Sequence, residues 1–299
     1  MVYSGGVRFE SAPTPEPRVL HILSLQVVWR SNMRRNTRQT PAFTLVELLV
    51  VIGIIALLIA ILLPALQKAK QQALKLACAA NLRSQGQGLA VYINDTKYYP
   101  GHAGIASNGR PVAVWPSRLR KFAKATRGIF GCPANEEGFR WRDVTGPPGG
   151  IYATDADARL GYDKGELLLD VDRVPFSYGY NDWGTDNCGS YANPSRPQKG
   201  LGADTWDKRC PELRASKVRK PSEMFAIMDN ICNGSWDYNV DPTNDKEWPG
   251  KLHNRGANVL FCDGHVGWYL QKDLVNINKS SPGGYAMNSM WNNDNKPYP

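Results

Sequence analysis

The sequence predicts an α+β protein: a long N-terminal helix, membrane-spanning in its first half, is packed on a β-rich, mostly antiparallel, loop-rich globular head. Two observations carry this prediction. Residues 43–63 form an apolar run that a single acid, Glu47, interrupts. As a helix rising about 1.5 Å per residue, the run spans roughly 30 Å, the thickness of a bilayer's hydrocarbon core. After residue 93 the chain is rich in Gly, Pro, Asn, Asp and aromatics, with short apolar stretches between turn signals, which is typical of short strands joined by long loops.

Changes in composition divide the chain into four segments. The first is polar and basic, contains Arg34, Arg35 and Arg38, and ends in the small residue Ala42. Met33, followed by Arg34 and Arg35, is a natural start, so we expect residues 1–32 to be a mis-called extension upstream of the true start. The segments are a leader (1–42), a transmembrane helix (43–63), the continuation of that helix outside the membrane (64–93) and the head (94–299).

Beyond Pro64 the helix is expected to continue to about Tyr92, because small and apolar residues recur at steps of three and four. Pro64 lacks an amide hydrogen and clashes with the preceding turn, so we expect a kink or local melting there. Gly86 and Gly88 should weaken the last turns. The recurring residues are Leu66, Ala69, Ala73, Ala77 and Ala80.

The head offers three recognisable elements. The clearest is a hairpin over residues 257–270, where alternating apolar residues flank Asp263-Gly264, a two-residue turn signal. The apolar run 224–228 is expected to pair nearby. An amphipathic helix is expected around residues 116–127. Its inward residues are Leu119 and Phe122, and its outward residues are Arg118, Lys121 and Lys124.

Residues 42–52, which read Ala-Phe-Thr-Leu-Val-Glu-Leu-Leu-Val-Val-Ile, closely resemble the N-terminal signature of type IV prepilins and type II secretion pseudopilins. The resemblance implies that a membrane peptidase cuts between Ala42 and Phe43 and methylates the new amine of Phe43. It also implies that Glu47 directs assembly and that Pro64 is the helix-kinking proline of that family. The alternatives are an ordinary signal anchor with an accidental acid or a secretory signal peptide. A cleaved signal peptide has a shorter apolar core, with its cleavage site after that core.

A carboxylate in a membrane helix costs on the order of 2–3 kcal/mol, so Glu47 indicates a partner or a task. Residues four apart share a helix face, so a Phe43 amine and the Glu47 carboxylate are neighbours. In a bundle of staggered copies, the amine of one copy can pair with the carboxylate of the next. Leaving either charge unpaired costs several kcal/mol, so the pairing selects the register of the stacked helices.

The same resemblance implies the partners and the location. We expect a prepilin peptidase that is also a methyltransferase, other copies and related pseudopilins, and the secretion or pilus assembly machinery. The chain should cross a bacterial inner membrane once, with its N-terminus cytoplasmic and its head periplasmic, or extracellular within a filament. Without the leader, 30 basic and 25 acidic residues leave a net charge of +5. The head contains no run of Lys and Arg longer than two, so we expect no dedicated nucleic-acid binding.

All six cysteines follow the membrane segment, and an even number in an exported head permits disulfides. The preferred pair is Cys188 with Cys210, which bracket a loop rich in Gly, Asn and Pro. The second is Cys78 with Cys132, which would tie the helix to the head. Small buried thiols are the alternative, above all for Cys262. Because no CxxC motif occurs, a zinc ribbon is not expected.

Further motifs of the head resemble a large pseudopilin-like family that is typical of planctomycetes. Its C-terminal signature is a His, nine residues, then Asp-Gly, which here is His253 with Asp263 and Gly264. This resemblance implies a filament subunit, but it does not name a cargo. The other matching stretches are 78–83, 98–100, 130–133 and 177–181.

The competing hypothesis is a membrane-tethered periplasmic hydrolase or binding protein with an uncleaved signal anchor. Asp229, His253, Asp263 and His265 would then act as metal ligands or as an acid/base set. Each has a simpler role, since Asp263 makes the turn, His265 starts the returning strand and His253 pins the preceding loop. No nucleophile elbow, HExxH motif or phosphate loop accompanies them. We therefore expect a structural protein and not an enzyme.

No cofactor is expected, with calcium as the alternative. Major pseudopilins of type II secretion commonly hold calcium in a C-terminal loop, and Asp237, Asn239 and Asp241 offer oxygen ligands at alternate positions. An EF-hand is excluded because Pro242 stands where that loop needs Gly. A solvated acidic loop without metal explains the same residues.

Overall fold

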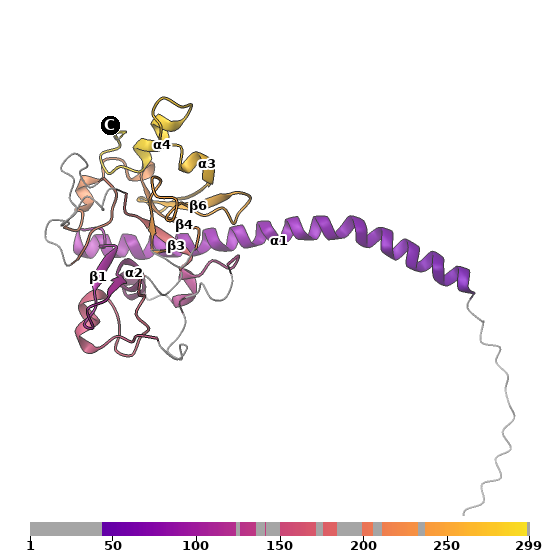
Figure 1. The fold of residues 1–299 in the computed structure, drawn as a ribbon, viewed down its shortest axis with the longest axis horizontal. Coiled ribbons are helices and arrows are strands. Elements are labelled where there is room, and N and C mark those ends of the chain that lie inside the picture. Colours follow the sequence, from indigo (N-terminus) through magenta and orange to yellow (C-terminus); the bar gives the residue numbers. More distant parts are fainter. Residues whose placement is uncertain are drawn as a thin grey trace, which may run out of the picture. The chain divides into compact units, whose positions relative to one another are not determined.

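The fold comes from a computed structural model of the chain (Figure 1). It describes residues 44–123, 126–135, 141, 150–171, 176–183, 199–205, 211–232 and 237–297. The predicted leader, the Ala42–Phe43 cleavage site and the Cys188–Cys210 pair lie outside the described residues. The chain divides into two compact units, Met1–Ile54 and Ile55–Pro299.

Helix α1 runs from Leu45 to Thr96, close to the predicted limits. Pro64 lies inside it and the helix is continuous there, so of the two expected outcomes local melting is excluded and a kink stays a prediction. Every residue of 44–73 is exposed. From Leu74 onward one face is buried, and its buried residues are Cys78, Leu82, Gln85, Gly86, Gly88, Leu89 and Tyr92.

The buried face of α1 differs from the stripe that the sequence suggested, since Leu66, Ala69, Ala73, Ala77 and Ala80 are not buried. The buried face instead carries residues whose shape fits the surface of the head. An added Cβ at Gly86 would lie 2.8 Å from Leu260 Cδ1 and 3.5 Å from the Gly264 Cα. The glycine therefore lets the helix approach the hairpin closely, which is a packing role and not only a weakening of the helix.

Five strands form the main sheet in the order β5-β3-β4-β6-β7. All neighbours are antiparallel except β3 and β5, which are parallel, so the mostly antiparallel head is confirmed. A second sheet pairs two short antiparallel strands. The strands are β1 (Ala103–Ile105), β2 (Pro111–Ala113), β3 (Tyr178–Asn181), β4 (Phe225–Asp229), β5 (Asn239–Val240), β6 (Gly256–Phe261) and β7 (Val266–Leu270).

The predicted hairpin is confirmed as β6 and β7, and the predicted run at residues 224–228 is confirmed as β4, which pairs with β6. The turn is one residue longer than expected. The Phe261 amide donates to the His265 carbonyl at 2.9 Å, so three residues, 262–264, form the loop. Gly264 has a φ of +94°, as the last residue of a three-residue loop with a bulge requires.

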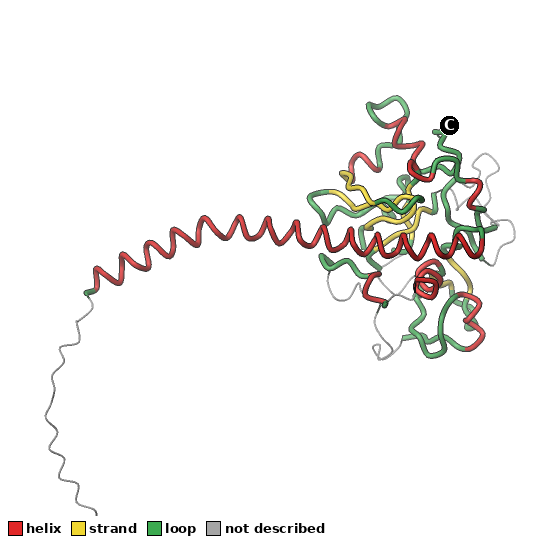
Figure 2. The backbone as a smooth tube through the Cα atoms, turned by 180° about the vertical axis from the view of Figure 1, so that it is seen from behind, coloured by secondary structure: helices red, strands yellow, loops and turns green. Residues whose placement is uncertain are grey.

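Both faces of the main sheet are covered. Side chains of β6 alternate between two apolar clusters, with Leu260 in the cluster that includes α1 and with Val259 and Phe261 in the other. The second cluster draws Leu274 from α3 (Gln271–Leu274) and partly buried methionines from α4 (Gly284–Met290). Figure 2 shows the C-terminal half of α1 running beside the strands. Every residue of β6 is buried for this reason.

Helix α2 spans Trp115–Ala123 and is shorter than expected at its C-terminal end. Leu119 is buried as predicted. Arg118 was expected to point outward, yet it is largely buried, pairs with Glu212 and donates to the Tyr92 hydroxyl at 3.2 Å. An acid that is distant in sequence supplies the partner, which no local pattern reveals. Short 3-10 helices follow at Arg127–Phe130, Asp155–Leu160, Ala215–Lys217 and Pro221–Glu223.

Candidate functional site

The exposed first half of α1 is the first candidate site. In the described part of the chain, α1 is long and apolar enough to cross a membrane, and its most apolar window has no share buried inside the protein. A core helix of a soluble protein would be covered. Large aliphatic side chains here are about half exposed or more, for example Leu57 at 63% and Ile61 at 66%. An apolar surface of this extent indicates a lipid or helix-bundle environment.

Glu47 begins this helix through a reciprocal cap with Thr44. The Thr44 amide and hydroxyl donate to Glu47 Oε2 at 2.9 and 2.8 Å, and the Glu47 amide donates to Thr44 Oγ1 at 3.2 Å. This is a capping box, which satisfies amides that the first turn leaves without partners. The sequence reasoning missed this role, although Thr-x-x-Glu before an apolar run is its signature.

One of three comparisons with known proteins matches this segment. Residues 38–63 match the family model described as the prokaryotic N-terminal methylation motif. The match supports a type IV prepilin-like protein. The searches of curated proteins and of solved structures found no match for this chain. The motif thus points to a structural, membrane-anchored subunit processed by a prepilin peptidase, while the planctomycete-type family with its C-terminal signature stays a prediction.

The second candidate site lies where α1 meets the head. A disulfide joins Cys78 on α1 to Cys132, which is one of the two pairs that the sequence suggested. The segment that carries Cys132 is held on α1 by two amides, since Asn81 Nδ2 donates to the Gly131 carbonyl at 3.0 Å and Gln85 Nε2 donates to the Ile129 carbonyl at 2.7 Å. One face of a helix therefore supplies both the cysteine and the groups that position its partner.

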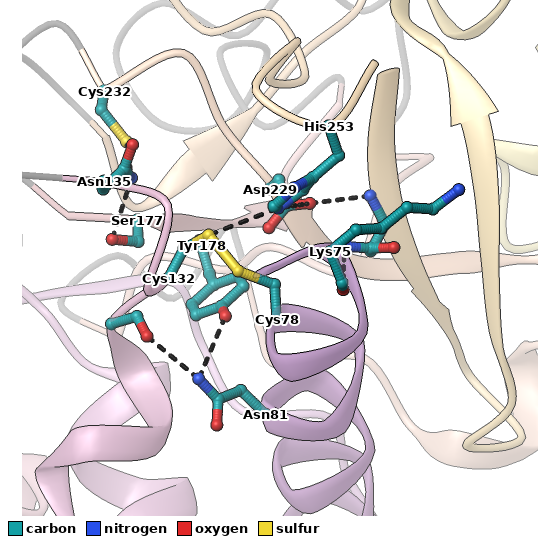
Figure 3. The surroundings of a disulfide bond; sticks show 12 residues. Lys75, Cys78, Asn81, Cys132, Asn135, Ser177, Tyr178, Asp229, Cys232 and His253 are labelled. Carbon is teal, nitrogen blue, oxygen red and sulfur yellow. Dashed lines mark hydrogen bonds and ion pairs between the residues drawn. A yellow bond between two sulfur atoms is a disulfide. The ribbon is translucent and has the colours of Figure 1, made fainter. Parts of the chain in front are cut away.

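His253 and Asp229 flank this disulfide (Figure 3). His253 Nε2 lies 3.4 Å from Cys132 Sγ and 3.5 Å from Asp229 Oδ2. Asp229 ends β4, and its Oδ2 accepts the Asn258 amide at 2.7 Å. The His253 carbonyl accepts the indole N–H of Trp268 at 2.8 Å. The Asp229 carboxylate is thus held by β6, and the His253 main chain is held by β7.

Burial favours the uncharged form of both side chains, because it shifts the pKa of each. Burial raises the pKa of Asp229 to about 7, against the hydrogen bonds from Asn258. Burial lowers the pKa of His253 to about 4, and the Lys75 ammonium contributes to this shift. At neutral pH the imidazole is uncharged, so it presents a lone pair and can bind a metal ion.

The structure does not assemble the acid/base set pictured from the sequence. Asp229 and His253 meet at the buried disulfide, whereas Asp263 and His265 contact each other at 2.6 Å in the exposed hairpin turn. The separation follows from the hairpin, because Asp263 and Gly264 form its tip. The four residues are therefore two independent pairs, and the buried pair is covered on all sides.

The suggested calcium ligands lie on and beside β5. Asp237 Oδ2 accepts the Phe176 amide at 3.1 Å, and Asp241 Oδ1 accepts the Thr243 amide at 2.6 Å. Asn239 belongs to the strand itself. Hydrogen bonds of the fold thus use carboxylate oxygens of both acids, and calcium binding at this loop stays a prediction.

Proposed function

We propose that this chain is a pilin-like or pseudopilin-like structural subunit of a type IV filament or a type II secretion-like assembly. In this proposal a prepilin peptidase cleaves between Ala42 and Phe43 and methylates the Phe43 amine. The observation that carries the proposal is the exposed apolar first half of α1, which bears both the methylation motif and Glu47. In the assembly, this surface packs against the same surface of other copies and related subunits.

Glu47 has two tasks in this proposal. Within one subunit it caps the first turn of α1 together with Thr44. Between subunits its charge pairs with the methylated Phe43 amine of a neighbour, which sets the register of stacked helices. Burying a charge without its partner costs several kcal/mol in such an interior, so other registers are disfavoured.

The head is proposed to face the periplasm, with the N-terminus in the cytoplasm. A disulfide between Cys78 and Cys132 suits that side, because disulfides persist in oxidising compartments. The proposed partners are the peptidase, the assembly machinery, further subunits and the inner membrane.

The test separates the two tasks of Glu47. Glu47→Gln keeps an oxygen that accepts the Thr44 hydrogen bonds, since Gln also serves in capping boxes, but it removes the charge. Glu47→Ala removes both, at a cost of about 1 kcal/mol to the helix start. We expect both variants to insert and fold, and both to lose assembly. Subunit crosslinking and filament recovery at matched expression are the measurements.

Glu223→Gln is the matched control, because Glu223 is an exposed acid of the head that pairs with Lys220. It should assemble normally. Assembly by Glu47→Gln together with failure by Glu47→Ala would assign the role of Glu47 to helix capping. Normal assembly by both would remove Glu47 from the mechanism altogether.

Processing is tested separately by the intact mass of the protein extracted from membranes. The proposal expects the mass of the chain from methylated Phe43 to Pro299. A mass that retains the leader would instead support an uncleaved signal anchor.

A further inference from the structure

Four side chains with metal-binding atoms meet at the junction of α1 and the head. Cys78, Cys132, Asp229 and His253 each offer one such atom, and these atoms all lie within 4.8 Å of one another. All four residues are buried. They come from α1, from the segment after the 3-10 helix at Arg127–Phe130, from the end of β4 and from the loop before β6. The fold therefore brings together metal-binding atoms from four separate segments of the chain.

The spacing of the imidazole and the carboxylate fits a metal shell better than a hydrogen-bonded pair. His253 Nε2 lies 3.4 Å from Cys132 Sγ, which is ordinary for a contact with sulfur, but 3.5 Å from Asp229 Oδ2. A hydrogen bond from nitrogen to oxygen is about 2.7–3.2 Å long. Around tetrahedral zinc, with bonds of about 2.0–2.3 Å, neighbouring ligand atoms lie about 3.3–3.8 Å apart. The imidazole and the carboxylate are therefore already separated as two zinc ligands would be.

The carboxylate of Asp229 also has an oxygen that is free to accept a further bond. Its Oδ1 atom is buried and has no hydrogen-bond partner in the described part of the protein. Burying a polar atom without a partner is costly, and native proteins seldom leave one so. Its Oδ2 atom is oriented by the Asn258 amide, as second-shell partners orient metal-binding carboxylates.

We propose that Cys78 and Cys132 are a redox pair whose reduced form, together with Asp229 and His253, binds one zinc ion. A dithiol reductant gives two electrons to the Cys78–Cys132 bond, becomes a disulfide itself and leaves two thiols. Zinc then displaces the two thiol protons. Two thiolates, a neutral imidazole and a carboxylate complete a tetrahedral shell, for which the two sulfurs must move to about 3.8 Å apart.

The site preserves the link between α1 and the head in either redox state. With the disulfide formed, a covalent bond joins Cys78 of the helix to Cys132. With the thiols reduced, zinc joins the same two residues and adds β4 and the loop before β6 to the link. The Lys75 ammonium, which acts electrostatically on His253, offsets the net negative charge of such a shell.

The experiment uses the full chain in detergent, in its oxidised form and after reduction with a phosphine in the absence of air. Each form is exposed to zinc, passed through gel filtration and analysed for metal per chain. We expect one zinc per reduced chain and none per oxidised chain. X-ray absorption at the zinc edge of the reduced wild type should then give two sulfur ligands and two nitrogen or oxygen ligands.

Variants assign the site. His253→Gln and Asp229→Asn keep both thiols and should weaken zinc binding at least about tenfold. Cys262→Ser removes a free thiol that is not one of the four ligands and should bind as the wild type does. Equal zinc uptake by the oxidised and reduced forms would overturn the proposal. A shell of four sulfurs would also overturn it, because two of them would have to come from other cysteines. The absorption measurement uses the wild-type chain, so it does not depend on a variant that folds poorly.

Discussion

The two halves of α1 form one continuous helix but differ completely in burial. Residues 44–73 are exposed without exception, although they include the most apolar run of the chain. Residues 74–96 contain more polar and small residues, yet one of their faces is buried. Apolarity alone therefore does not predict which part of a helix packs on its own protein. The packed half is distinguished by shape, because Gly86 and Leu82 fit the surface of the head.

The difference also separates two kinds of environment. Over residues 45–63 of the first half, aliphatic side chains cover the helix almost all round, as lipid or a helix bundle requires. In the second half, a single stripe faces the protein and Arg83 lies off it. Matched substitutions should therefore lower the stability of the head in the second half and not in the first, and three pairs test this from the largest expected effect to the smallest.

The largest effect is expected for the leucines. Leu82→Ala empties a fully buried position and should destabilise the head by about 2–5 kcal/mol. Leu57→Ala, at a side chain that is 63% exposed, should leave the melting temperature of the head unchanged. Thermal unfolding of the full chain in detergent, followed by near-UV circular dichroism, measures both. Equal shifts in the two variants would contradict the division of the helix.

A smaller effect is expected for the glycines. Gly86→Ala places a Cβ 2.8 Å from the buried Leu260 side chain, and such overpacking costs about 1–3 kcal/mol. Gly53→Ala meets nothing within 4 Å and replaces a weak helix former by the best one, so it should not lower stability. The same unfolding experiment compares them. A stabilising Gly86→Ala would mean that the helix does not approach the hairpin closely.

The smallest effect is expected at the boundary. The Lys75 ammonium lies 4.1 Å from the centre of the Trp268 ring, where a cation–π contact contributes about 0.5–1 kcal/mol. Lys75→Met keeps the aliphatic stem and removes the charge. Lys70→Met makes the same change one turn and a half earlier, at an exposed position, and should have no effect. Indistinguishable melting temperatures would move the start of the packed half beyond Lys75.

Several elements followed from the sequence because their causes are local. The apolar run at residues 43–63 predicted the first half of α1, and the alternation around Asp263-Gly264 predicted β6 and β7. The cap formed by Thr44 and Glu47 was equally local, and the Thr-x-x-Glu pattern could have revealed it.

Other features were beyond sequence reasoning because their causes are distant in the chain. The pattern of the helix by itself places Arg118 on the outer face. Its inward position depends on the ion pair with Glu212. The parallel contact of β3 with β5 and the burial of β6 on both faces depend on which segments cover the sheet.

The sequence by itself determined that this protein has a membrane-length helix with an acid near its start, followed by a mostly antiparallel head, because hydrophobic periodicity and turn chemistry act over neighbouring residues. Only the tertiary structure decided which face of α1 is buried and which side chains meet there. Cys78, Cys132, Asp229 and His253 lie in four separate stretches of the chain, and no spacing rule connects them. Their meeting depends on the close approach of α1 to the sheet, which the shapes of the packed surfaces control.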